Sequence, residues 1–339
     1  MKKYLSAIFG MATVALCAQK TNDDLTKWSS GRPDGHAPIS VMGDHVHGKG
    51  EWMFSYRYML MHMQELKQGS KNVSTDTALE NYMVTPTNMP MNMHMFGAMF
   101  APSNKITLMA MFNYASMEMD HVNRMGGIFT TESNGFGDLQ FSMLYRFFNL
   151  NRQSLHGQLG FSIPTGSISE KDVTPASAPN QTVLPYPMQL GSGTFDQNLA
   201  LTYLGQSESV SWGSQLKGVF RFGENDREYH LGNRYNWNNW FAVKASNWLS
   251  FSIRAEGLVV NGIEGGDPNL NPMMVITADT SNSGGTFLTG GIGFNIYVPS
   301  GTMKNVRFGF ELASPLYQNV DGIQLKTKET LTFGTQYSF

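Results

Sequence analysis

The chain has 339 residues, a formal net charge of -2, 12% aromatic residues and only 15% charged residues. Soluble proteins usually carry about 25% charged residues, so this composition is not typical of them. The near-neutral balance gives no electrostatic reason to expect a nucleic-acid partner. After the N-terminus no run of about eighteen apolar residues occurs, which excludes membrane-spanning helices. Low charge and many aromatic residues without such helices are typical of a transmembrane β-barrel, whose strands alternate between two faces.

The first residues have the pattern of a secretory signal peptide. Two lysines precede an apolar stretch from Leu5 to Ala18, so we predict a signal peptide over residues 1–18. The only cysteine, Cys17, would be removed with it, leaving a mature protein without disulfides. A lipoprotein modified at Cys17 is the less favoured alternative, because the bulky Leu16 precedes it where a small residue is wanted.

Residues 19–50 are predicted to form an irregular N-terminal arm in the periplasm. The segment is polar and contains prolines and glycines. It carries His36 and then the sequence Asp44-His45-Val46-His47. Residues two apart in an extended chain face the same way, so His45 and His47 would present their imidazoles on one side. We interpret the pair either as a metal contact or as an ordinary solvated loop.

From residue 51 to residue 339 the sequence alternates with a period of two, which predicts β-strands. The clearest segment is residues 105–119, where an apolar register that ends in an aromatic alternates with a register rich in methionine. Twelve such segments predict a single up-and-down antiparallel β-barrel of about twelve strands. The predicted strands are residues 51–64, 89–101, 105–119, 136–148, 154–163, 194–204, 210–222, 235–246, 249–260, 286–298, 306–313 and 324–339.

The connections between these strands alternate between short and long. Residues 102–104 make a short connection, and residues 120–135 and 164–193 make long ones. Outer-membrane barrels have short periplasmic turns and long external loops. An even number of strands then places both termini of the chain in the periplasm. We therefore predict that the protein is exported to the outer membrane of a Gram-negative-type bacterium, with outer-membrane lipid around it.

Three segments resemble a known family. They are GFGDLQFSMLYRF at Gly135–Phe147, GSGTFDQNLALTYL at Gly191–Leu204 and SNWLSFSIRAEG at Ser246–Gly257. The family is a group of outer-membrane β-barrels named for a proposed role in the meta-pathway of phenol degradation. The resemblance covers about the C-terminal two thirds of the chain. It implies a barrel with a transporter role, and the family name suggests aromatic compounds as cargo. The methionine-dense start of the barrel departs from typical members.

Seventeen of the 23 methionines lie between Met42 and Met143. Twelve of them share the inward register of the first three predicted strands, where neighbouring side chains would lie about 4.5–5.5 Å apart. Thioether sulfur suits Cu(I), and imidazole binds copper generally. The alternative is packing, because methionine fills irregular space. The candidate metal ligands are Met59, Met61, Met63, Met91, Met93, Met95, Met117, Met119, His121, His45 and His47.

We therefore interpret the protein as an outer-membrane channel or transporter. The preferred cargo is Cu(I) or a similar soft metal ion, and no cofactor is required. Passage of small hydrophobic or aromatic compounds is the first alternative, and a structural barrel without transport is the second. We expect no enzyme activity, because no Gly-x-Ser-x-Gly motif occurs and the outward register offers no serine–histidine pair at matched depth. The sequence leaves the oligomeric state open.

Overall fold

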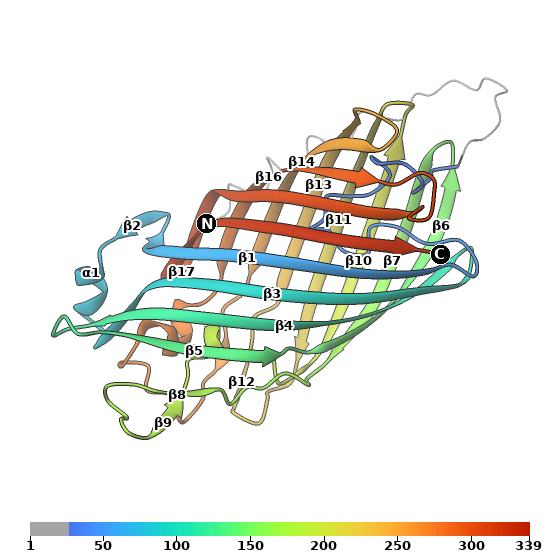
Figure 1. The fold of residues 1–339 in the computed structure, drawn as a ribbon. Helices are drawn as coiled ribbons and strands as arrows, with labels where there is room; N and C mark the ends of the chain where they lie inside the picture. The colour runs from blue at the N-terminus through green and yellow to red at the C-terminus, as the bar shows by residue number, and fades with distance from the viewer. Residues whose placement is uncertain (1–26) are drawn as a thin grey trace, which may run out of the picture.

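A computed structural model of the protein describes residues 27–339, so the predicted signal peptide and residues 19–26 lie outside the described part. Antiparallel strands form one closed barrel, because the last strand pairs with the first. Figure 1 shows the tilted strands, with the C-terminus at one end and α1, β8 and β9 at the other. The ring consists of β1 (Trp52–Gly69), β3 (Val84–Ser103), β4 (Ile106–Asn123), β6 (Leu139–Leu150), β7 (Gln153–Ile163), β10 (Phe195–Gln206), β11 (Val210–Phe222), β13 (Arg234–Lys244), β14 (Leu249–Val260), β16 (Gly285–Tyr297) and β17 (Val306–Ser338).

Strand β17 contributes two passes of the wall. Its first part, up to Val320, pairs with β16, and its second part pairs with β1. The chain reverses at Gly322, which has a φ of 64°. Glycine reaches this left-handed conformation without a steric penalty, and a Cβ there would lie 2.1 Å from Asn282 Oδ1. The eleven ring strands of the described residues thus make twelve passes, which confirms the predicted barrel of about twelve strands.

Several strands are longer than the sequence pattern predicted. Residues 120–135 were expected to form a long loop, but β4 continues to Asn123 and β5 (Ile128–Phe136) pairs with its second half. The predicted loop over residues 314–323 is likewise mostly strand. Beyond the lipid both registers of a strand are polar, as in Thr130–Asn134, so the apolar alternation disappears while the hydrogen-bonded ladder continues.

Short elements cover the end of the barrel with the long loops, which we call the long-loop end. They are β2 (Lys71–Val73), α1 (Thr75–Leu79), β8 (Lys171–Val173), β9 (Gln181–Val183), the 3-10 helix η2 (Tyr186–Met188), β12 (Tyr229–His230), β15 (Glu264–Gly265), η3 (Ile276–Ala278) and η4 (Thr280–Asn282). Ser74 caps α1 by accepting a hydrogen bond from Thr77 N. Between residues 27 and 339 no helix is long and apolar enough to cross a membrane.

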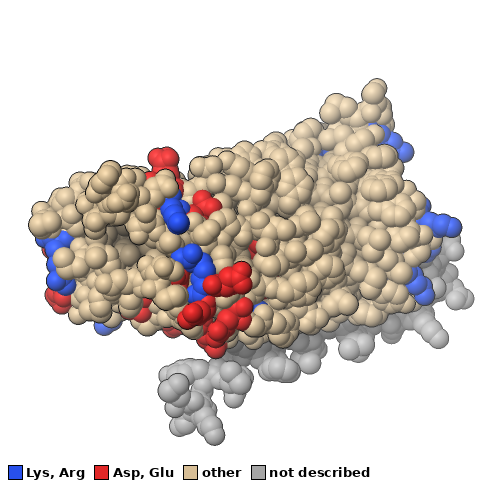
Figure 2. Space-filling model, turned by 90° about the horizontal axis from the view of Figure 1, so that it is seen from below, with Lys and Arg blue, Asp and Glu red and all other residues tan. Residues whose placement is uncertain are grey.

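The outside of the wall is apolar between the two ends. Outward side chains such as Phe241, Ile253 and Ile292 are exposed on the surface of the barrel. In Figure 2 charged side chains lie over the left half of the molecule and at its right end, and a broad uncharged band separates the two groups on the face shown. The opposite register points inward, and Met109, Met111 and Met117 are buried there. The prediction that each strand has one lipid face and one lumen face is thereby confirmed.

The N-terminal arm lies inside the barrel. It enters at the end with the short turns, where Trp28 N donates to Asn149 Oδ1 (2.7 Å) and Ser29 N donates to Gln206 Oε1 (3.0 Å). Most side chains from residue 33 to residue 47 are buried. We call residues 28–48 the plug. The arm was expected to lie in the periplasm, and for these residues that expectation is corrected: the plug occupies the lumen because the inward side chains of the wall hydrogen-bond to it.

The apolar outer face of the barrel wall leads to a prediction about stability. Ile292 faces outward near the middle of β16 and pairs with Ile253, whereas Val259 faces outward close to the long-loop end of β14. Ile292→Arg should cost roughly 2–4 kcal/mol of folding free energy and Val259→Arg only about 0–1 kcal/mol, because the cost of a cation falls with distance from the bilayer midplane. Denaturant titrations in lipid vesicles measure both values, and equal costs would contradict the assigned lipid face.

Candidate functional site

Three arginines of the wall donate to backbone carbonyls of the plug. Arg57 Nε on β1 donates to Ile39 O over 2.9 Å. Arg307 on β17 donates to Ala37 O, and Arg146 on β6 donates to Val46 O. The plug has no regular secondary structure, so its carbonyls need partners from elsewhere. Each of these hydrogen bonds satisfies a plug carbonyl and an inward cation together.

Other inward side chains of the wall also hydrogen-bond to the plug. His156 on β7 hydrogen-bonds to Gly43 O (2.9 Å), and Gln215 on β11 donates to Met42 O (3.0 Å). Ser250 on β14 donates to Pro33 O (2.7 Å). Ser40 Oγ donates to Glu311 (2.8 Å), which also pairs with Arg254. The plug is thus attached around much of the circumference of the barrel.

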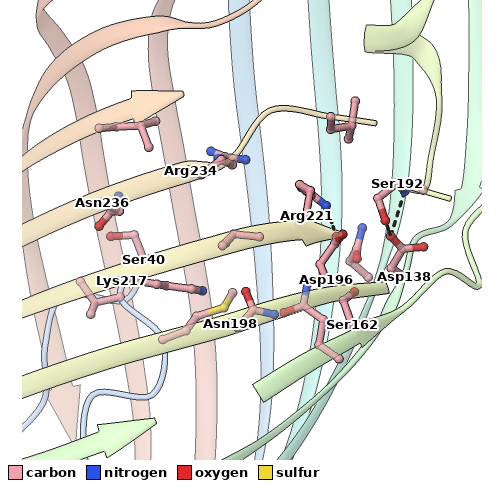
Figure 3. Close-up of a pocket in the computed structure, with 18 of the residues that line it drawn as sticks. Ser40, Asp138, Ser162, Ser192, Asp196, Asn198, Lys217, Arg221, Arg234 and Asn236 are labelled. Atoms are coloured by element: carbon pink, nitrogen blue, oxygen red, sulfur yellow. Dashed lines mark hydrogen bonds and ion pairs between the residues drawn. The ribbon is translucent and has the colours of Figure 1, made fainter. Parts of the chain in front are cut away.

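A polar cavity of about 430 Å³ remains in the lumen beyond the plug. Ser40–Met42 of the plug border it on one side, and Gln189–Ser192 border it towards the long-loop end. Figure 3 shows Arg221 directed at its neighbour Asp196 and Ser192 directed at Asp138, all four in the lining of this cavity. Lys217, Arg234 and Glu256 also line the cavity. The cavity is therefore charged but contains cations and anions together.

Two groups of inward methionines lie on either side of this region. The first is packed around Val46 of the plug and Leu144; we call it the plug methionine cluster, and it contains Met42, Met53, Met99, Met109 and Met111. The second lies towards the long-loop end with Leu184 and Leu190; we call it the long-loop methionine cluster, and it contains Met63, Met89, Met91, Met117, Met119 and Met188.

Strand register explains how the long-loop methionine cluster forms. Met61 pairs with Met91, and Met91 pairs with Met117 on the next strand. Met63 pairs with Met89. Of the predicted ligands, the structure gathers Met63, Met91, Met117 and Met119 in this cluster. Met59, Met61, Met93 and Met95 share the inward register and are half-buried, but they lie outside both clusters.

The long-loop methionine cluster includes two methionines that were not among the predicted metal ligands, Met89 and Met188. Met89 continues the inward register of β3, so the sequence pattern already contained its signal. Met188 comes from η2 in a loop that folds over the lumen, and no periodicity marks it.

His121 lies away from the methionines that it was expected to join. It is buried near the end of β4 and stacks on Phe129 with ring centroids 4.8 Å apart. Both side chains border a separate, mostly apolar cavity of about 510 Å³ under the loops of the long-loop end. Leu184 and Met274 also line this cavity. The structure thus places His121 in a different pocket.

His45 and His47 lie within the plug, together with His36 and Asp44. His45 Nδ1 is 3.1 Å from Asp44 Oδ1, and His36 Nδ1 is 3.7 Å from Asp44 Oδ2. The ring centroid of His45 is 4.7 Å from that of His36 and 4.6 Å from that of His47. The sequence placed His45 and His47 on one side, and the fold adds His36 from an earlier part of the arm.

Burial and neighbouring charges set the protonation of this group. Burial lowers the pKa of His36 to about 3, so its imidazole is neutral at physiological pH. Burial alone raises the pKa of Asp44, but the neighbouring His45 and His36 imidazoles, the first of them hydrogen-bonded to Asp44, hold that pKa well below its usual range. A neutral imidazole next to an ionised carboxylate is a combination that binds metal ions.

Comparisons with known proteins identify the fold. No protein-family model matches the sequence, and no curated protein matches it. Among solved structures, an outer membrane channel from Pseudomonas putida F1 is 13% identical with a TM-score of 0.64, covering 89% of this chain and 100% of that chain. The protein therefore has the fold of an outer-membrane β-barrel.

Two further solved structures are more distant. The transport unit of the autotransporter AIDA-I from Escherichia coli is 10% identical with a TM-score of 0.49, covering 89% of this chain and 94% of its own. The CymD monoaromatic hydrocarbon channel is 8% identical with a TM-score of 0.42, covering 86% of this chain and 89% of its own. At these scores the likeness supports no argument about function.

The hydrogen bonds that attach the plug lead to a second prediction, about conductance. Arg57→Met together with Arg307→Met removes two donors to plug carbonyls while keeping apolar bulk, so the plug should leave its position for part of the time. In planar bilayers the single-channel conductance should rise several-fold over the wild type. Arg227→Met, which breaks an ion pair with Asp267 in the outer loops, is the matched control and should leave conductance unchanged. Equal conductance of all three proteins would mean that the plug does not limit passage.

Proposed function

We propose that the protein is an outer-membrane channel that carries a soft metal ion, with Cu(I) as the preferred cargo. The observation that carries this proposal is the long-loop methionine cluster, in which thioethers from β1, β3, β4 and η2 pack together inside the lumen. Thioether sulfur is a soft ligand that prefers Cu(I) over the harder divalent ions. In this proposal the thioethers bind the ion strongly enough to select it and weakly enough to release it.

The arrangement along the lumen supports a path for such an ion. The polar cavity is lined by Leu190, which packs on the long-loop methionine cluster, and by Met42 of the plug methionine cluster. An ion that entered through the outer loops would meet sulfur at two depths. Export by the N-terminal signal peptide and insertion in the outer membrane of a Gram-negative-type bacterium belong to this proposal, as does the absence of enzyme activity.

Small apolar or aromatic compounds are the second candidate cargo. The cavity beneath the outer loops favours them, because Phe129, Leu184 and Met274 give it a mostly apolar lining and its volume of about 510 Å³ suits a small ligand. Membership of the family named for the phenol meta-pathway, which the three sequence segments suggest, would agree with this cargo. A barrel without any transport role is the third reading.

Exchanging sulfur for carbon separates these readings. Met91→Leu, Met117→Leu, Met119→Leu and Met188→Leu in one variant keep the apolar volume of the long-loop methionine cluster and remove its donors. If the proposal is right, the variant binds Ag(I), a redox-stable substitute for Cu(I), at least about tenfold more weakly than the wild type. Isothermal titration in detergent measures both affinities.

The matched control changes Met125, Met143 and Met303, which are exposed and lie outside both clusters, to leucine, and its Ag(I) binding should equal that of the wild type. Unchanged Ag(I) binding by the cluster variant would overturn the soft-metal reading. If the cluster variant also took up an apolar dye as the wild type does, the second candidate would be favoured.

A further inference from the structure

Three ligand-type side chains meet inside the plug. His36, Asp44 and His45 each offer one ligand atom, and these atoms all lie within 4.8 Å of one another. The three residues are only 7%, 4% and 2% exposed. Two of them are neighbours in sequence, but His36 is brought to them by the fold of the arm. Convergence of two imidazoles and a carboxylate in a buried place is typical of a metal site.

The hydrogen bonds of this group leave ligand positions unused. Asp44 Oδ2 accepts from Ala37 N (3.0 Å), and Asp44 Oδ1 lies 3.1 Å from His45 Nδ1. In the described part of the chain, His45 Nε2 and His36 Nδ1 are buried without a hydrogen-bond partner. Such buried orphans cost free energy, and a bound ion would satisfy both.

A third imidazole lies next to the site. The His47 ring is 4.6 Å from that of His45, and both its nitrogens are buried without a hydrogen bond. Glu51 Oε2 is 3.5 Å from His47 Nδ1, which is too long for a strong interaction. His47 is therefore the nearest additional donor for an ion held by the other three side chains.

We propose that His36, Asp44 and His45 bind a divalent transition metal ion inside the barrel and that this ion fixes the plug in the lumen. Imidazole and carboxylate donors suit Zn(II), Ni(II) or Cu(II) rather than Cu(I), which prefers sulfur. The resident ion is thus chemically distinct from the cargo proposed for the methionines. The neighbouring wall arginines repel a cation, so the donor atoms, and not the surrounding field, hold the ion.

The position of the site couples the ion to the plug. His36 and Asp44 flank residues 37–43, and within this loop the wall binds the carbonyls of Ala37, Ile39, Met42 and Gly43. An ion that joins the two ends keeps the loop in the shape that fits the wall. Because the donors are buried, the ion enters or leaves only when the plug shifts, so occupancy favours the seated plug.

Metal titration of the full-length protein in detergent tests the site. Zn(II) should bind the wild type at about one ion per chain, and Co(II) should give the visible absorption of a nitrogen–oxygen site. His36→Gln together with His45→Gln removes two of the three proposed ligands. The double variant should therefore bind Zn(II) at least about tenfold more weakly than the wild type. His230→Gln changes a histidine of β12 in the outer loops and should bind Zn(II) as the wild type does. A wild type that binds no Zn(II), or a double variant that binds it equally well, would overturn the proposal.

Conductance in planar bilayers tests the coupling. A chelator should raise the conductance of the wild type and added Zn(II) should restore it, whereas the double variant should respond to neither. A wild-type conductance that ignores chelator and Zn(II) would overturn the role in fixing the plug. If the double variant fails to fold, the melting temperature of the wild type decides: Zn(II) should raise it, and no shift would count against the site. Ag(I) binding by the long-loop methionine cluster is a separate readout, so the two proposals can fail independently.

Discussion

The structure depends on hydrogen bonds between inward side chains of the wall and the carbonyls of an arm that has no regular secondary structure. Arg57, Arg146 and Arg307 are inward cations that need acceptors, and Ile39, Val46 and Ala37 have carbonyls that need donors. Either set left alone in the lumen would be unsatisfied, and a buried polar group without a partner costs about 1–3 kcal/mol. Each set satisfies the other, which is why the arm lies in the barrel and not outside it.

The plug also explains how the lumen is divided. Its Val46 packs against the plug methionine cluster, its Ser40–Met42 stretch borders the polar cavity, and its histidines are enclosed by the wall. Most of the clustered sulfur donors lie on wall strands, whereas the cluster of His36, Asp44 and His45 lies in the plug. The two proposals therefore concern different donor sets, thioethers for a soft ion and imidazole with carboxylate for a borderline ion. The proposed plug site is buried, whereas the methionines of the wall are spread over several strands.

The sequence predicted the wall well and the interior poorly. Alternation of apolar and polar residues identifies a strand where one face contacts lipid and the other faces the lumen, as around Ile292 and Met109. The alternation disappears where β4 and β5 extend into water. The inward direction of Met91 and Met117 follows from their register alone. No local pattern brings Met188 over the lumen or His36 to His45, because loop and arm conformations depend on contacts distant in sequence. The arm was assigned to the periplasm because its polar composition resembles that of a solvated segment.

The central claim is that thioethers inside the barrel provide the site for a soft metal ion. Crystals of the protein soaked in Ag(I) and measured for anomalous scattering test it most directly, because the map locates the ion without reference to transport. The account predicts an anomalous peak bonded to sulfur between Met91, Met117 and Met119. Silver found only on the plug histidines or on the outer surface, with none at these sulfurs, would contradict it.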